Sequence, residues 1–251
     1  MASQPGTAGG GSIDFGRAFA FYFEDPDWLK KTLIGGGLYL AGTIGLVLLL
    51  AGLLLYAMVA GYAMRVMQRA YAGDPRPLPE WEDYGGLMRD GFKLVLLSLG
   101  YAAIFFALPA LVIVVITVIA SASHSDALSG LMALVVVLMQ LLAMLLGLGY
   151  LIYAPSAVAR MTLYQRLGAG FEFKENLALI KRNPANYGIA LLIIVVTHVV
   201  SQVGVILCCV GLFATSFWSF CVSAWVLGEV VRRDPLIGQP LAPAPAPTPG
   251  L

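Results

Sequence analysis

The chain has 251 residues, of which 59% are hydrophobic and only 12% are charged. Soluble domains contain about 45–50% apolar and about 25% charged residues, so this composition excludes an ordinary soluble protein. The formal net charge of +1 arises because acidic residues lie beside the basic ones, and it gives no reason to expect a nucleic-acid partner.

The two ends of the chain have a composition that cannot form a core. Residues 1–12 (MASQPGTAGGGS) carry no basic segment of the kind that begins a cleavable signal, and residues 235–251 are rich in proline and alanine. We expect disordered tails at 1–12 and 235–251, and a helical membrane domain at 13–234.

Four long stretches contain no Asp, Glu, Lys or Arg: 32–64, 94–125, 127–159 and 187–228. A membrane core of about 30 Å is crossed by about 20 helical residues, so the second and third stretches each hold one span. The fourth would reach about 63 Å as a single helix, twice the thickness of the core. It is expected to form two spans that turn at Cys208–Gly211.

The first stretch allows three readings: one long helix, a re-entrant pair, or a hairpin of two short spans. The hairpin would use helices at 27–44 and 46–70, with Lys30, Lys31, Arg65 and Arg69 extending to the membrane surface. We favour the hairpin, because of where the charges lie.

Every lysine and arginine falls in one of four clusters, at 17–31, 65–93, 160–182 and 232–233. Basic segments remain in the cytoplasm, so an even number of spans must separate each pair of clusters. We therefore predict an all-α integral membrane protein with about six membrane helices in three hairpins. Both termini are then cytoplasmic.

The three hairpins have related surroundings and divide the domain into repeat-like units at 13–75, 76–166 and 167–234. Apolar residues recur at helical spacing before the first hairpin (Phe15, Phe19, Phe23) and before the third (Phe173, Leu177, Ile180). Each hairpin is expected to follow a short amphipathic helix in the membrane interface. Two series of small residues predict close helix packing: Gly37, Ala41 and Gly45, and then Ala57 and Gly61.

Three segments resemble the prokaryotic DUF4013 family of multi-pass membrane proteins: 23–31 (FEDPDWLKK), 74–84 (DPRPLPEWEDY) and 90–93 (DGFK). With the third hairpin, the similarity covers roughly residues 13–232. The resemblance implies residence in a prokaryotic plasma or inner membrane. It implies no activity, since the family is a domain of unknown function.

The loop at 73–93 is the most informative polar segment. Its prolines make the first part stiff and extended, and Glu80, Trp81, Glu82, Asp83 and Tyr84 then combine acids with aromatic rings. With Trp28, these residues are our candidates for contacts to a protein partner or to lipid headgroups. The alternative is an interfacial linker that Trp81 anchors and the acids solvate. The acid spacing matches no calcium loop, and no metal or cofactor is expected.

Few polar side chains fall inside the apolar stretches, and Gln140, His198 and Gln202 are the main ones. His198 and Gln202 are four residues apart and share a helix face. They could line a polar path with Gln140, although hydrogen bonding between packed helices is the simpler reading. Pro109 is expected to kink the first helix of the middle hairpin.

No nucleophile with a neighbouring base is present, so we expect no enzyme activity. The three cysteines lie in one apolar stretch and are expected to act as small packing residues. The preferred hypothesis is a non-enzymatic scaffold, or an accessory or assembly factor, that acts through its cytoplasmic face. The alternative is a small transporter or channel with its path near His198 and Gln202.

Overall fold

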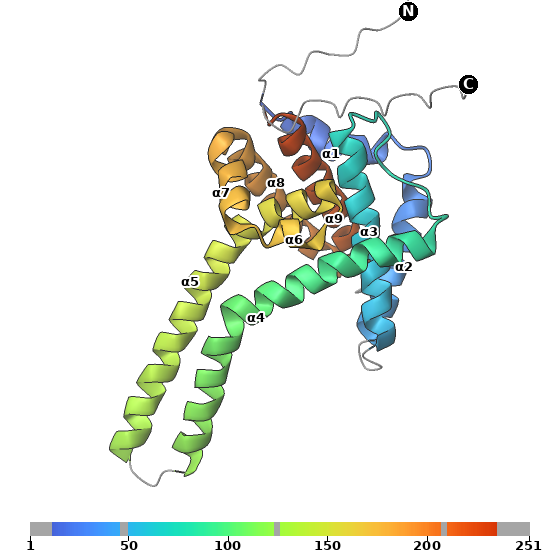
Figure 1. Ribbon diagram of the computed structural model, residues 1–251. Coiled ribbons are helices and arrows are strands. Elements are labelled where there is room, and N and C mark those ends of the chain that lie inside the picture. Colours follow the sequence, from blue (N-terminus) through green and yellow to red (C-terminus); the bar gives the residue numbers. More distant parts are fainter. Residues whose placement is uncertain (1–11, 46–49, 123–125, 207–209, 235–251) are drawn as a thin grey trace, which may run out of the picture.

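The computed structural model describes residues 12–45, 50–122, 126–206 and 210–234 (Figure 1). All regular elements in these four ranges are helices, in agreement with an all-α fold. The expectations for the tails and for Cys208 and Cys209 fall on residues outside the described ranges.

The first apolar stretch forms two helices, α2 (Trp28–Gly45) and α3 (Leu50–Tyr71), after the short helix α1 (Phe15–Phe23). The reading as one long helix is therefore wrong. The end of α2 packs on the start of α3, where the ring centroids of Tyr39 and Tyr56 are 5.1 Å apart. The hydroxyls of Thr43 and Tyr56 lie 2.7 Å apart in the same contact.

The middle unit consists of two long helices, α4 (Tyr84–Ala122) and α5 (Asp126–Tyr164). The first half of α4 crosses α3, and its second half runs beside α5 (Figure 1). Figure 1 shows a bend in α4, and this helix contains Pro109, which removes a backbone hydrogen bond. No separate amphipathic helix precedes this unit. That expectation is wrong, because residues 84–93 continue into α4 without a break.

The crossing of α3 and α4 is close because small residues meet there. A Cβ atom on Gly61 would overlap the backbone of Leu87, and one on Gly91 would overlap the backbone of Ala57. The prediction for Ala57 and Gly61 is confirmed.

The prediction for the other small-residue series, in α2, is wrong. Gly37 and Ala41 are exposed. The helix instead turns Gly35 and Gly36 toward Phe217 and Ala214 of α9 (Val210–Arg232). Small residues lie on several faces of this glycine-rich helix, so their spacing alone does not identify the packed face.

The third unit has two short helices, two long helices and one 3₁₀ turn: α6 (Leu167–Gly170), α7 (Phe173–Arg182), α8 (Pro184–Gln202), η2 (Val203–Ile206) and α9 (Val210–Arg232). Helix α8 starts with Pro184 in its first turn, a position that proline favours. The Asn183 side chain accepts a hydrogen bond from the Asn186 amide at 3.4 Å.

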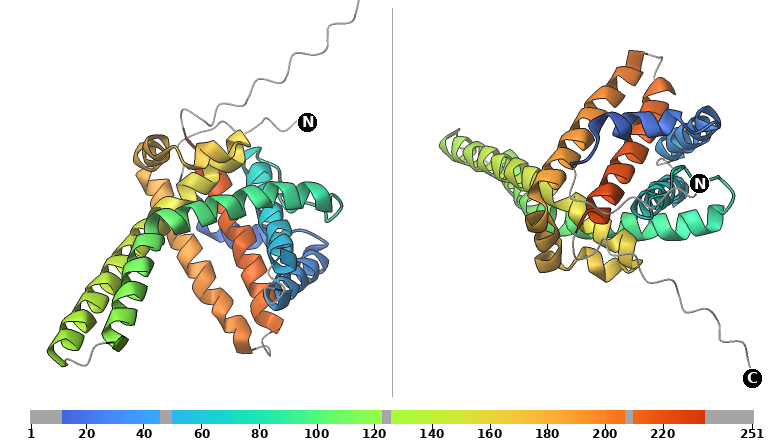
Figure 2. Two further views of the ribbon diagram at one scale, coloured as in Figure 1. Left: turned by 60° about the horizontal axis from the view of Figure 1, so that its bottom comes forward. Right: turned by 90° about the horizontal axis from the view of Figure 1, so that it is seen from above.

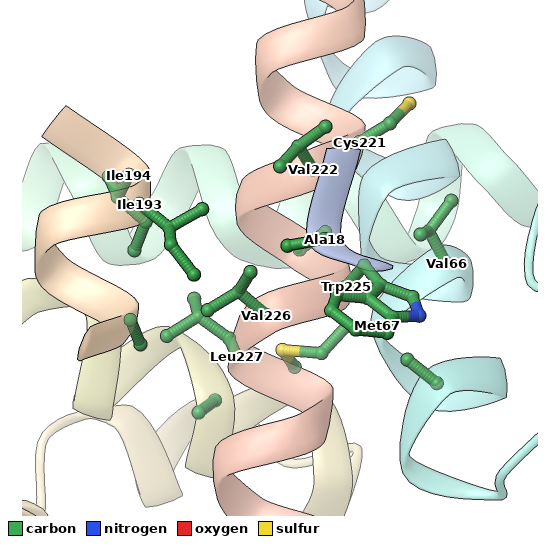
Figure 3. Packing of buried hydrophobic residues seen from close by; sticks show 14 of the residues in the cluster. Ala18, Val66, Met67, Ile193, Ile194, Cys221, Val222, Trp225, Val226 and Leu227 are labelled. Carbon is green, nitrogen blue, oxygen red and sulfur yellow. The ribbon is translucent and has the colours of Figure 1, made fainter. Parts of the chain in front are cut away.

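Helix α9 lies at the centre of the packed part of the molecule and contacts α1, α2, α3, α5 and α8. In the view of Figure 3, Val226 and Trp225 of α9 lie between Ile193 of α8 and Val66 of α3. Cys221 is also fully buried on α9, in agreement with a packing role.

Four helices are long and apolar enough to cross a membrane in the part of the chain that the structure describes. They are Tyr84–Ala107, Gly130–Tyr164, Pro184–Ile206 and Gly211–Arg232. Half of the most apolar window of Gly211–Arg232 is buried in the protein, whereas none of the window in Gly130–Tyr164 is. Most of α5 therefore presents its apolar side chains to the surroundings of the protein.

Candidate functional site

The segment between α3 and α4, residues 72–83, is irregular but firmly attached. It begins with Gly73, whose φ of +74° lies in the left-handed region that glycine adopts readily. The amides of Gly73 and Asp74 donate to the carbonyls of Ala70 and Arg69, each at 3.0 Å, and so close the end of α3.

A buried lysine clamps this loop to the start of α2. The Lys31 side chain is 3% exposed, and its Nζ lies 2.9 Å from Asp25 Oδ2 and 2.6 Å from Glu80 Oε1. Nζ also donates to the carbonyl of Leu78 at 3.4 Å. The three donors of the ammonium group thus match three acceptors, which is the condition for burying such a charge. The expectation that Lys31 reaches outward is wrong. Its neighbour Lys30 is exposed.

Trp81 holds the loop on the other side. Its ring stacks on Tyr62 of α3 with centroids 4.3 Å apart and lies 5.9 Å from the ring of Phe217. The Tyr62 hydroxyl donates to the carbonyl of Pro79 at 2.9 Å. Trp81 is only 7% exposed, so it anchors the loop to the helices and is not available to a partner or to lipid.

The end of the loop is fixed by Asp83, which caps α4. Its Oδ1 accepts a hydrogen bond from the Gly86 amide at 2.9 Å, and its Oδ2 lies 2.7 Å from Arg65 Nη2. The Gly86 N–H and then the Arg65 guanidinium lower the pKa of Asp83. The cap therefore stabilises the folded state at neutral pH, and this contribution is lost as the pH falls through the lowered pKa.

The exposed side of the clamped loop is an acidic surface, which consists of Glu80, Glu82, Asp83 and Tyr84. Tyr84 is 47% exposed, and the Asp83 and Glu80 side chains are 64% and 50% exposed although each is ion-paired. The structure thus brings these four candidates together.

Trp28, the remaining candidate for a contact to a partner or to lipid, lies among apolar residues instead of on the acidic surface. Its ring lies 5.1 Å from Phe23, and it lines an apolar cavity of about 480 Å³ between α1, α2, α8 and α9.

Two further sets of ion pairs join different helices or the residues that flank them. Glu172 lies 2.5 Å from both Arg160 of α5 and Arg166. Arg182, at the end of α7, lies 2.9 Å from the buried Asp234. The sequence analysis missed these pairs and the Lys31 clamp. A buried lysine is not distinguished by sequence from its exposed neighbour.

The three candidate polar residues in the apolar stretches do not converge. His198 is exposed, and its Nδ1 lies 2.7 Å from the carbonyl of Ile194 on its own helix and 3.2 Å from the Ser219 hydroxyl of α9. Gln202 donates at 3.4 Å to the carbonyl of His198. Gln140 is exposed on α5 and makes no hydrogen bond to a described residue. A cavity of about 490 Å³ between α2, α3, α4 and α9 is lined by other residues.

Within the described residues, no group of three or more His, Cys, Asp and Glu side chains is placed to hold a metal ion. The candidate site is a surface supported by buried ion pairs and aromatic stacking.

These features define an all-helical protein with several apolar helices of membrane-spanning length. A family model described as "Protein of unknown function (DUF4013)" matches residues 44–210, about two thirds of the chain. The chain belongs to the DUF4013 family, as the sequence motifs indicated. No curated protein and no solved structure matches it. The match includes Glu80 and Trp81 and begins after Asp25 and Lys31.

The buried clamp predicts different effects for two adjacent lysines. We expect Lys31→Ala to lower the free energy of unfolding by about 3 kcal/mol, because it leaves the buried Asp25 without its counter-ion. Lys30→Ala should change it by less than about 0.5 kcal/mol, since that side chain is exposed. Denaturation of both variants in the same detergent measures the difference. Equal losses of stability would contradict the clamp.

Proposed function

We propose that the protein crosses the membrane six times, as three hairpins, with both termini in the cytoplasm. The short links at 46–49, 123–125 and 207–209 carry no lysine or arginine, whereas the other ends of the long helices do. Figure 1 shows α1, α7 and the C-terminal end of α9 at one end of the molecule. Helix α2 has 18 residues, about 27 Å of helix, which makes it a short span in this arrangement.

Helices α1 and α7 support contact with lipid at the cytoplasmic surface. In α1, Phe21 and Tyr22 are buried against the protein, whereas Phe15 and Phe23 are 44% and 54% exposed. In α7, Phe173 and Leu177 are similarly 45% and 44% exposed. Exposed apolar side chains beside charged ones are typical of helices that lie in the headgroup region.

For this face of the membrane, the geometry favours a non-enzymatic scaffold, or an accessory or assembly factor. The proposal rests on one observation, that the acidic surface is held in a fixed position. Buried Lys31, stacked Trp81 and the capping Asp83 together hold it there. A surface held rigid before binding loses less conformational entropy when a partner docks. Its exposed carboxylates and Tyr84 fit a basic segment of a cytoplasmic or membrane protein. This role requires no catalytic group.

The topology can be tested with single cysteines at positions 72, 125 and 233, introduced after Cys208, Cys209 and Cys221 are replaced. In intact cells, a membrane-impermeant maleimide should label position 125 alone. Positions 72 and 233 should react only after the membrane is permeabilised. Labelling of position 72 from outside would refute the three-hairpin arrangement.

The docking surface can be tested by in-cell photo-crosslinking from position 84, next to the acidic residues. We expect discrete protein adducts that Glu82→Lys weakens at least about tenfold, because a like charge opposes the basic partner.

Glu24→Lys provides the matched control, since Glu24 is an exposed carboxylate outside the loop. It should leave the adducts unchanged. An adduct pattern that is the same with and without Glu82→Lys would count against the acidic surface as the docking site.

A further inference from the structure

The second half of α4 and the adjoining part of α5, residues 109–122 and 126–150, form an arm that leads away from the other helices (Figure 2). Its large apolar side chains are exposed. Val118 is 62% exposed, Leu145 67% and Met144 74%. The arm therefore has two helices in contact with each other and broad faces that no other described part of the chain covers.

Two sides of α5 differ in their position relative to α4: one contacts α4, and the other is exposed. Tyr150 turns toward α4, where its ring centroid is 6.0 Å from that of Phe105. A different stripe is exposed along five turns and consists of Ala133, Val137, Gln140, Met144, Leu148 and Leu151. Spacings of three and four residues place these six on one side of the helix. We call this stripe the Gln140 seam.

Gln140 is the polar exception in this seam. Two hydroxyl groups of α4 in the arm are satisfied within their own helix. Thr117 donates to the carbonyl of Ile113 at 2.7 Å, and Ser121 donates to that of Val118 at 2.8 Å. The Gln140 amide has no partner among the described residues. It lies ten residues, or about 15 Å along the helix, inside the apolar span Gly130–Tyr164 of α5. Lipid chains offer it no hydrogen bond, and an unsatisfied amide there is unfavourable.

We propose that the Gln140 seam is a homodimer interface and that its occupant is the same seam of a second copy. All copies insert with the same orientation, so a two-fold axis along the membrane normal brings identical residues together at identical depth. A glutamine amide carries both an acceptor and donors, so two facing Gln140 side chains satisfy each other with two reciprocal hydrogen bonds. The apolar seam residues on either side pack across the same axis. This inference does not depend on the acidic surface.

The interface can be measured with the full-length protein in phosphatidylcholine vesicles, by energy transfer between labelled copies over a range of protein-to-lipid ratios. Wild-type protein should associate. Gln140→Leu should weaken association about tenfold, because two hydrogen bonds are lost. Gln140→Asn should retain much of the association, and Gln202→Leu, a change on α8, should leave it unaltered. Wild-type protein that is monomeric at all ratios, or association unaffected by Gln140→Leu, would overturn the proposal.

A second measurement separates the geometry from any effect on folding. In the cysteine-free background, Met144→Cys lies on the seam and Leu138→Cys lies on a different side of α5. Both native side chains are highly exposed, at 74% and 51%. Oxidation in the vesicles should link copies through position 144 and far less through position 138. Equal crosslinking at the two positions would also overturn the proposal.

Discussion

The buried ammonium group of Lys31 needs acceptors close by, and two separate segments supply them. Asp25 comes from the connection between α1 and α2, and Glu80 comes from the loop between α3 and α4. Neither segment is regular, and neither would be fixed by backbone hydrogen bonding alone. Because removing Lys31 would leave both carboxylates without their counter-ion, the ammonium group fixes the loop, the start of α2 and the end of α1 together. The stacking of Trp81 on Tyr62 and the Asp83 cap then position the remainder of the loop.

The same end of the molecule holds most of its interior packing. Phe217, Val222 and Trp225 of α9 are buried among residues of α1, α3 and α8, and ion pairs of Glu172 and Asp234 connect the surrounding helices. The arm of α4 and α5 contrasts with this region, because its apolar side chains are exposed on most sides. The molecule thus combines a rigid, charged part with an apolar part whose contacts lie outside the single chain. The first suits recognition by charge, and the second suits lateral association in the membrane.

Sequence reasoning succeeded where one property decides the outcome. The length of the uncharged stretches predicted the helices of the first and third units close to their bounds. The motif at 74–84 lies within the residues that the family model matches, whereas the motif at 23–31 precedes them. Sequence reasoning failed where the choice depends on three-dimensional packing. The spacing of Gly37 and Ala41 resembled a packing motif, yet Gly35 and Gly36 make the contact. Trp81 was interpreted as an outward anchor, because an interfacial and a buried tryptophan have the same local sequence. Lys31 and Lys30 could not be distinguished for the same reason.

The coupling between Lys31 and Glu80 tests the central claim most directly. A double-mutant cycle with Lys31→Met and Glu80→Gln, combined with hydrogen exchange of the amides of residues 78, 80 and 81, measures both the pair and the loop that it holds. We predict a coupling energy of at least about 1 kcal/mol, and a common loss of amide protection in either single variant. Additive effects of the two changes, with the protection of the loop unaltered, would contradict the account.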